Sequence, residues 1–287
     1  MRRMRAFCPG HVTGFFEICR GEDLLSTGSR GAGFNTSLGA TSEVSVKDAA
    51  RQKVSVRIAG EEHRAEVTKH ALRYLLGKDR LEVRVSTRLD LPLSQGFGMS
   101  AAGSMSASLA LAEILGLGTN DAYEAAHVAD IVCGGGLGDV SGLAAGGAEV
   151  RVRPGLPPIG EVRRFDGTPR LSLAVIGRRL RTKGVLTDAV KAAAINRHGA
   201  AMVRRLLDRP TFEDFTALSW SFATATGLAS SAVKEVVRSL PSGDGGSMSM
   251  LGNSVFTTAS AKELRKVVPK RTAVYECRVD SKGPRVI

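Results

Sequence analysis

The sequence has 287 residues, of which 43% are hydrophobic and 24% charged, and its formal net charge is +12 at pH 7. This composition is typical of a soluble globular protein with one large or two smaller domains. No apolar run approaches the roughly 20 residues needed to cross a bilayer. No long apolar core follows the basic residues 1–5, as a secretory signal would require. We therefore expect a cytoplasmic protein without a membrane partner.

The positive charge and the cysteines indicate no special class of protein. The densest basic cluster, residues 178–183, is short and has no aromatic residues interleaved with it for base stacking. A positive field also attracts ATP and acidic small molecules. We expect a solvated basic surface and no nucleic-acid partner. The four cysteines form no CxxC pair and have no zinc-type spacing to histidine, so we expect reduced thiols.

Hydrophobic periodicity predicts helices and strands in both halves of the chain. The predicted strands are 54–58, 81–85, 171–176, 255–258 and 272–279. The predicted helices are 66–76, 100–115, 122–132, 188–207, 212–226, 230–239 and 261–267. Thr211 followed by Asp214 resembles a capping box at the start of one of them. Three prolines and a glycine between residues 153 and 158 mark a connection. The sequence therefore predicts an α+β protein with two domains, residues 1–160 and 161–287.

The most specific pattern is the glycine-rich segment 92–104, PLSQGFGMSAAGS, at the start of the helix predicted at 100–115. Glycine lets the backbone approach a ligand without a Cβ clash. The first amides of a helix have no partner within it and, with the helix dipole, form an anion site. The segment lacks the Gly-Lys-Ser/Thr of a Walker A loop and the third glycine of a dinucleotide fingerprint. Taken alone, it fits a phosphate loop and a plain turn equally well.

The segment resembles the phosphate loop of the GHMP kinases, with the pattern PxxxG-(Leu/Phe)-Gly-x-Ser-Ala-Ala. Residues 8–17, CPGHVTGFFE, and 245–256, GGSMSMLGNSVF, are similar to the first and third motifs of that family. His11 stands where the family has Lys or Arg, and Met99 replaces the first serine of the loop. The resemblance implies ATP as phosphoryl donor and Mg²⁺ as cofactor. It implies nucleotide contacts at Pro92, Gly96, Phe97, Gly98, Met99, Ser100, Ala101, Ala102 and Ser104.

Within this family the chain is most similar to the archaeal pantoate kinases, through residues 9–16, 28–34 and 136–140. This similarity implies an N-terminal domain of the ribosomal-protein-like β-α class and a ferredoxin-like C-terminal domain. It also implies ATP-dependent phosphorylation of pantoate to 4-phosphopantoate, a step of coenzyme A biosynthesis. Whether the protein forms a homodimer stays an open question at this point.

We expect four residues to bind the acidic acceptor: His11, Thr13, Ser29 and Arg30. The Arg30 guanidinium, in a glycine-rich segment, can pair bidentately with a carboxylate. The other three side chains supply hydrogen-bond donors. A solvated loop charge is an equal alternative for Arg30.

Asp139 is the expected catalytic carboxylate, seven residues before Gly146-Gly147 as in the family. It would accept the proton of the acceptor hydroxyl or orient that hydroxyl; a structural Asp in a glycine-rich turn is the alternative. The expected Mg²⁺ ligands are Ser100 and Asp130. The family usually has Glu at the position of Asp130. A plain surface carboxylate is the alternative for Asp130. We expect Lys183 to be solvated and not to contact phosphate.

Other functions remain open on the sequence. One is a GHMP kinase that acts on homoserine, shikimate or a mevalonate-like acid, which an assay across these alcohols would identify. A second is a non-catalytic nucleic-acid-binding protein of related fold, which would bind RNA with steep salt dependence and would not need Asp139. A third is a sensor that binds its ligand without turnover.

Overall fold

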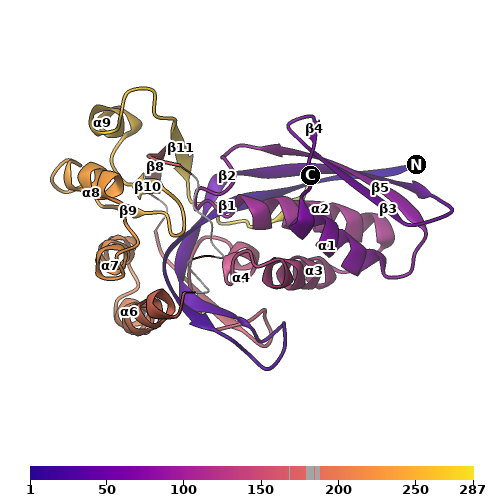
Figure 1. The fold of residues 1–287 in the computed structure, drawn as a ribbon, viewed down its shortest axis with the longest axis horizontal. Helices are drawn as coiled ribbons and strands as arrows, with labels where there is room; N and C mark the ends of the chain where they lie inside the picture. The colour runs from indigo at the N-terminus through magenta and orange to yellow at the C-terminus, as the bar shows by residue number, and fades with distance from the viewer. Residues whose placement is uncertain (168, 179–183, 185–187) are drawn as a thin grey trace.

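In the computed structural model, all residues except 168, 179–183 and 185–187 are described. The chain forms a larger and a smaller sheet, each with helices packed on it, along the longest axis of the molecule (Figure 1). This mixture of strands and helices in both halves confirms the predicted α+β class. Lys183 and most of the basic cluster at 178–183 lie outside the described residues.

The larger sheet is built around two long antiparallel strands, β1 and β2, which pair along almost their whole length. The strand order is β12-β1-β2-β5-β3-β4, and β6 and β7 continue from β2. Its strands are β1 (Arg2–Cys19), β2 (Gly28–Asp48), β3 (Lys53–Ile58), β4 (Glu61–Glu62), β5 (Leu81–Leu89), β6 (Ala148–Arg153), β7 (Glu161–Phe165) and β12 (Arg285–Val286). Residues 31–34 of β2 pair with β6 and residues 40–48 with β5, so one strand joins two parts of the sheet.

Two helices, α1 (Glu66–Leu76) and α2 (Met99–Leu115), cover one face of the larger sheet, and α3 (Thr119–Val132) packs on these helices (Figure 1). The helix α2 is buried on nearly all sides, because it lies between the strands β1 and β2 and the helices α1 and α3. Alanine, leucine and serine around its whole circumference allow this burial. The short helix α4 (Asp139–Ala145) follows α3 and packs against β1, β2 and β6.

The smaller sheet is antiparallel with the order β11-β8-β10-β9. Its strands are β8 (Arg170–Val175), β9 (Gly246–Met248), β10 (Ser254–Thr257) and β11 (Val274–Arg278), and its helices are α6 (Ala189–Asp208), α7 (Phe212–Ala225), α8 (Ser231–Arg238) and α9 (Ala261–Val267). Side chains cap all four helices at their N-termini, each worth about 1 kcal/mol. At α7, Thr211 caps the Asp214 amide at 3.1 Å, but its own amide donates to Arg209, so only half of a capping box forms.

A cluster of phenylalanine side chains joins the two halves. Phe15 and Phe34 come from β1 and β2, Phe215 and Phe222 from α7, and Phe256 from β10. Their ring centroids lie 5.3–6.4 Å apart, and each ring is fully buried. Aromatic pairs at such distances contribute about 0.5–1.5 kcal/mol each beyond their burial. The two sheets therefore share one apolar core.

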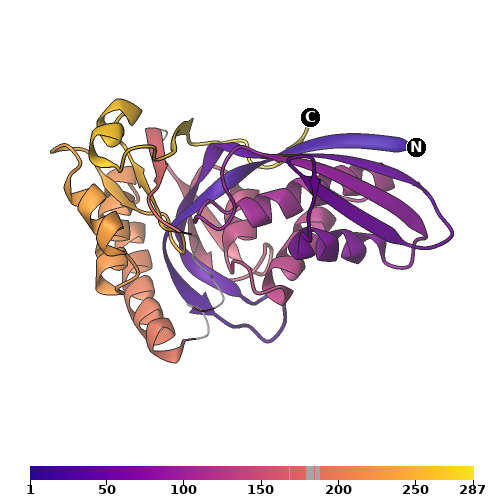
Figure 2. The same ribbon diagram turned by 45° about the horizontal axis from the view of Figure 1, so that its top comes forward.

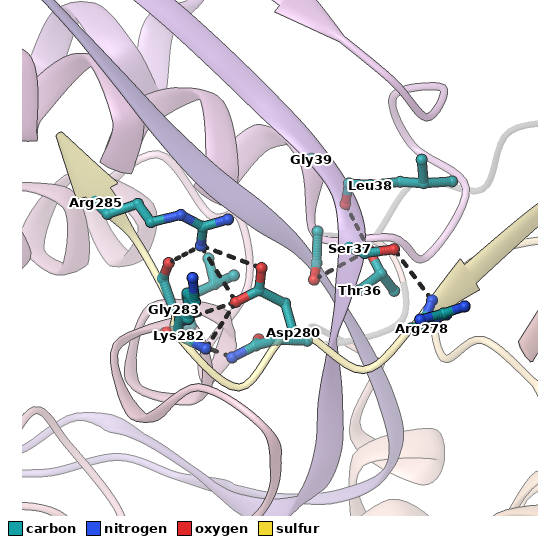
Figure 3. A network of polar contacts seen from close by, with 12 residues as sticks. Thr36, Ser37, Leu38, Gly39, Arg278, Asp280, Lys282, Gly283 and Arg285 are labelled. Carbon is teal, nitrogen blue, oxygen red and sulfur yellow. Dashed lines mark hydrogen bonds and ion pairs between the residues drawn. The ribbon is translucent and has the colours of Figure 1, made fainter. Parts of the chain in front are cut away.

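The hydrogen-bonded sheets divide the chain differently from the expected boundary at residue 160. Residues 161–165 form β7, which pairs with β6 of the larger sheet. The chain end also returns, since β12 pairs with β1. We call residues 279–287 the C-terminal strap. Figure 3 shows the Asp280 carboxylate accepting from the Lys282 and Gly283 amides and from Arg285. In Figure 2 the strap runs beside the N-terminal strand.

Throughout the part of the chain that the structure describes, every helix is too short or too polar to span a membrane.

Candidate active site

The predicted phosphate loop forms the start of α2. Gly98 is the N-cap residue, has φ of +61°, and offers no side chain to the free amides. A Cβ built on it would lie 2.9–3.1 Å from three atoms of His11, so both backbone conformation and space require glycine there. The first turn of α2 carries no acidic residue. The first amides of this 17-residue helix are thus available to an anion.

The three predicted motifs meet around this loop. The His11 amide donates to the Phe97 carbonyl at 2.9 Å, and the Met250 amide donates to the Thr13 carbonyl at 3.0 Å. A Cβ built on Gly252 would lie 2.1 Å from the Gln95 carbonyl, so only glycine allows this approach. Segments from both ends of the sequence therefore support the phosphate loop.

A cavity of about 400 Å³ opens beside the loop. It is lined by Thr13, Phe16, Ser29, Ser94, Gly96, Phe97, Gly98, Met99, Ser100, Asp130, Gly134, Gly135, Gly136, Leu137, Gly138, Asp139, Arg151, Met250 and Leu251. A second cavity of about 350 Å³ lies between α1, β5 and α2, and it shares Ser94, Met99 and Ser100 with the first. The phosphate loop thus borders two neighbouring spaces, and charged side chains line both: Asp130, Asp139 and Arg151 the first, Arg64 and Glu66 the second.

Four charged side chains form a chain of contacts behind the first cavity. His11 Nδ1 lies 2.8 Å from Asp139 Oδ1, and His11 Nε2 lies 3.0 Å from Glu149 Oε1. Arg151 Nη1 donates to the same Glu149 oxygen. We call these four residues the charge chain. The side chains of His11, Glu149 and Arg151 are at most 1% exposed, whereas that of Asp139 is 26% exposed and reaches the cavity.

Carboxylates on both sides favour the charged form of His11. Burial opposes that charge, but hydrogen bonds to Asp139 and Glu149 and the charges of both outweigh it, so the pKa of His11 lies above its usual value. Acidic and basic side chains then alternate along the charge chain, from Asp139 through His11 and Glu149 to Arg151. Alternation of acidic and basic groups lowers the electrostatic cost of burying three of these four side chains.

The carboxylate of Asp130 also faces the cavity but has no such compensation. Its side chain is buried, and Oδ1 has no hydrogen-bond partner among the described residues. A Cβ built on Gly136 would lie 3.1 Å from Asp130 Oδ2 and 2.5 Å from Asp139 Oδ2, so the two carboxylates flank one point. Burial and then the charge of Asp139 raise the pKa of Asp130 well above its usual value. This environment favours a bound cation.

The residues present fit one Mg²⁺ that is held partly by phosphate. The described residues contain no cluster of three or more His, Cys, Asp or Glu side chains that could hold a metal alone. Asp130 supplies one hard oxygen, and the exposed Ser100 hydroxyl at the start of α2 supplies another. Mg²⁺ commonly takes one or two protein oxygens and completes its shell with phosphates and water.

Asp130→Asn tests this environment directly. Because the folded-state pKa is raised, ionised Asp130 destabilises the ligand-free protein increasingly as pH rises from the unfolded pKa to the folded one. The amide removes that charge, so the ligand-free variant should melt about 2–4 °C higher at pH 8. It should also need roughly tenfold more Mg²⁺ for half-maximal activity. A lower melting temperature together with an unchanged Mg²⁺ requirement would contradict this interpretation.

The structure brings most of the predicted site residues together. Gly96, Phe97, Gly98, Met99, Ser100, Thr13, Ser29, Asp130 and Asp139 line the first cavity. His11 lies directly behind Asp139. By contrast, Ala101, Ala102 and Ser104 are buried within α2, and Pro92 lies before the loop; none of these four lines either cavity by the phosphate loop.

The placement of Arg30 corrects the expectation that it faces the acceptor. Neighbouring side chains of a strand point to opposite faces, and Ser29 takes the cavity side. Arg30 instead donates to the Val152 carbonyl at 2.9 Å and to Glu17 at 3.1 Å. The guanidinium in the cavity belongs to Arg151, which the sequence interpretation missed together with Glu149.

Comparison with known proteins agrees with this geometry. Residues 65–147 match the family described as GHMP kinases N terminal domain. The pantoate kinase of Thermococcus kodakarensis is 36% identical over 271 residues, covering 92% of this chain and 90% of the relative. The pantoate kinase of Methanocaldococcus jannaschii is 33% identical over 260 residues, covering 90% and 93%. This chain belongs to the pantoate kinase family.

Solved structures extend the agreement to the whole fold of this pantoate kinase family member. A protein described as a phosphotransferase related to the CoA biosynthesis pathway has a TM-score of 0.88 at 32% identity, covering 100% of this chain and 99% of its own. The homoserine kinase of Cytophaga hutchinsonii has a TM-score of 0.70 at 17% identity, covering 100% and 98%, and shows the shared fold alone. The protein thus has the GHMP kinase fold and is an ATP-dependent small-molecule kinase.

Proposed function

We propose that this protein transfers the γ-phosphoryl group of ATP to a hydroxyl of pantoate and so forms 4-phosphopantoate, a step toward coenzyme A. One observation carries the choice of an acidic alcohol. The cavity beside the phosphate loop holds both a carboxylate suited to a hydroxyl, Asp139, and a buried guanidinium with free donors, Arg151. Because ATP is the donor, we propose the cytoplasm as the compartment.

The phosphate loop and the second cavity would hold the nucleotide. The free amides at the start of α2 suit the phosphates, since an anion there gains both hydrogen bonds and the helix dipole. The second cavity adjoins Ser100 and combines aliphatic side chains such as Leu89 and Leu93 with polar ones such as His63. Such a lining, with apolar walls and a few polar groups, suits an adenine base next to its phosphates.

The acceptor carboxylate would bind at Arg151. The Nε and Nη2 groups of Arg151 have no hydrogen-bond partner among the described residues, although the side chain is only 1% exposed. A Cβ built on Gly138 would lie 2.6 Å from Arg151 Nε and 2.2 Å from Ser29 Oγ, so both donors face the same part of the cavity. Two free N–H groups in a planar fork suit a carboxylate.

The phosphoryl transfer depends mainly on how the protein positions the reacting groups. Phosphoryl transfer has a loose transition state, so the protein aligns the hydroxyl and stabilises charge. Asp139 Oδ1 is held by His11, and Oδ2 lies toward Gly136 in the cavity wall. Oδ2 would orient the acceptor hydroxyl and take its proton. Asp130 and Ser100 would hold Mg²⁺, which when bound neutralises phosphate charge.

An acceptor panel tests the proposed function. Purified protein with ATP and Mg²⁺ is assayed for ADP release with pantoate, homoserine, shikimate and mevalonate, and the product is identified by ³¹P NMR. We expect a phosphomonoester with pantoate and a kcat/KM at least tenfold lower for each other acceptor, because homoserine adds an ammonium group, shikimate has a rigid ring and mevalonate has a longer chain between carboxylate and terminal hydroxyl. Turnover of another acceptor without turnover of pantoate would overturn the substrate assignment.

A further inference from the structure

Glu149 lies outside the surface that would contact the nucleotide or the acceptor. It lies on β6, is 0% exposed, and does not line the first cavity. Its Oε1 atom accepts from both His11 Nε2 and Arg151 Nη1, whereas Oε2 has no partner among the described residues. A buried carboxylate is unfavourable unless its charge is needed by its neighbours. Its two neighbours, His11 and Arg151, connect Glu149 to the two ends of the proposed acceptor site, Asp139 and the Arg151 guanidinium.

At one end, Glu149 fixes the protonation of His11. A neutral imidazole carries one N–H, so it would present a lone pair to either Asp139 or Glu149. With a carboxylate 2.8 Å from Nδ1 and another 3.0 Å from Nε2, the imidazolium satisfies both hydrogen bonds. The other charged groups nearby are Arg151, which contacts Glu149, and Asp130, which faces Asp139.

At the other end, Glu149 fixes the guanidinium. Arg151 gives Nη1 to Glu149 and leaves Nε and Nη2 for a ligand. A carboxylate bound to those donors would share the positive charge of Arg151 with Glu149. Glu149 would then be less neutralised by Arg151 and would stabilise the His11 imidazolium more strongly. The imidazolium in turn holds Asp139 Oδ1, which leaves Oδ2 for the acceptor hydroxyl.

We propose that Glu149 is a positioning residue that couples binding of the acceptor carboxylate at Arg151 to the state of Asp139 through His11. The coupling rests on the proposed function, because it assumes an acidic acceptor. Thermodynamic linkage makes it reciprocal: acceptor binding favours charged His11, and charged His11 favours acceptor binding. An acceptor without the carboxylate would bind less tightly and would also turn over more slowly once bound.

The direction of the pH dependence follows from the carboxylates that flank His11. The pKa of His11 is raised, so the stabilisation from its imidazolium is complete below the usual value near 6.5 and is lost as pH rises through the folded value. Activity that needs charged His11 should therefore fall as pH rises through this raised pKa. Removing the charge of Glu149 should lower the pKa of His11 and move this decline to lower pH.

Glu149→Gln, which keeps the shape and removes the charge, tests the coupling. We expect kcat for pantoate to fall roughly 10- to 100-fold, the range seen when outer partners of a functional group are lost. The alkaline limb of kcat should move about one pH unit or more toward acid. At a pH low enough for His11 to be charged in both proteins, the KM for pantoate should not rise, because Arg151 keeps its Nε and Nη2 donors. A raised KM with an unchanged pH profile would overturn the proposal and leave Glu149 a structural role.

Two further variants separate coupling from stability. Glu149→Asp keeps the charge and should restore most of the alkaline limb, although the shorter side chain lowers kcat. Asp280→Asn removes a carboxylate that is paired with Arg285 in the C-terminal strap, away from the cavity (Figure 3). It should lower the melting temperature without moving the pH profile. If Asp280→Asn also shifted the pH profile of kcat, the alkaline decline would reflect loss of stability, and the coupling would be refuted.

A measurement without turnover tests the same point. In ¹⁵N-histidine-labelled protein, the His11 signal is identified by its absence in His11→Asn. We expect a mainly imidazolium signal for His11 at pH 6.5, because its pKa is raised above that value, and a higher pKa after addition of pantoate. A mainly neutral imidazole signal at pH 6.5 in the wild-type protein would overturn the coupling, even where Glu149→Gln does not fold. Absence of pantoate phosphorylation by the wild-type protein would instead refute the proposed function.

Discussion

Asp139→Asn is expected to lower kcat about 10³-fold, within the usual range for loss of a general base. The amide has almost the same shape as the carboxylate, but it cannot take a proton from the acceptor hydroxyl. It also offers an N–H group where Oδ2 now lies toward the cavity. The KM for ATP should change less than about twofold, since the side chain of Asp139 is hydrogen-bonded to His11 and not to the phosphate loop. Steady-state kinetics with pantoate and ATP measure both quantities.

The control for this variant is Asp280→Asn, the same chemical change outside the cavity. It should keep kcat within about twofold of the wild-type value, because Asp280 does not line the cavity and pairs with Arg285 instead. Nucleotide binding by Asp139→Asn, followed by its thermal shift with ATP, should equal that of the wild-type protein. A kcat within tenfold of wild type would refute the role of Asp139 as a general base. A lost thermal shift with ATP would show that it supports the loop.

Local signals predicted the helices well, because each begins and ends at residues with a defined backbone role. The structure places α1 at Glu66–Leu76 and α9 at Ala261–Val267, the ranges that periodicity predicts. Gly77 follows α1 with φ of +51°, and Ser260 caps α9 through the Glu263 amide. Such start and stop signals involve neighbours in sequence, so they can be recognised without the fold.

The two longest strands were not predictable in the same way. Residues 28–39 of β2 contain four glycines and no apolar alternation, a composition more typical of a loop. They form a strand because β1 and β6 pair with them on both sides, at positions far away in sequence. Asp139 was likewise weighed as a loop residue, whereas it begins α4. Tertiary hydrogen bonding decided these segments, and sequence propensity did not.

Glu149 and Arg151 show why part of the site stayed hidden. They alternate with Val150 and Val152 along β6, so periodicity correctly separates the two faces of the strand. It does not say which face meets water, and charged residues are normally assigned to the wet face. Here the charged face is buried against His11. Only the complementary charges on β1 and α4, brought together by the fold, make that burial stable.

The placement of charges by the fold also explains how one site can suit both a triphosphate and an acidic acceptor. The phosphate loop presents uncharged amides, which suit a triphosphate whose charge varies during transfer. On the proposed function, the acceptor side instead carries Asp139 and Arg151, which contact His11 and Glu149 respectively. We propose that these two side chains select the acceptor by its own charge. The glycine-rich wall between residues 134 and 138 keeps space between the two parts.

Arg151→Lys is expected to raise the KM for pantoate roughly 10- to 100-fold and to change the KM for ATP little. Lysine keeps the positive charge beside Glu149, so the variant avoids an unpaired buried carboxylate. A single ammonium cannot give the fork of Nε and Nη2 donors, however. Loss of one charge-assisted hydrogen bond costs about 1.5–3 kcal/mol, which corresponds to that range in affinity. Initial-rate kinetics at varied pantoate and fixed saturating ATP measure it.

An acceptor without a carboxylate completes the test, because it separates recognition from general damage. If Arg151 binds the pantoate carboxylate, an analogue with a neutral group there should be a poor substrate of the wild-type protein. The Arg151→Lys substitution should then weaken it no further, since the two changes remove the same interaction and their effects are not additive. Equal losses for pantoate and for the neutral analogue would place the carboxylate elsewhere in the cavity, with Ser29 and Thr13 as the remaining polar side chains that line its acceptor side.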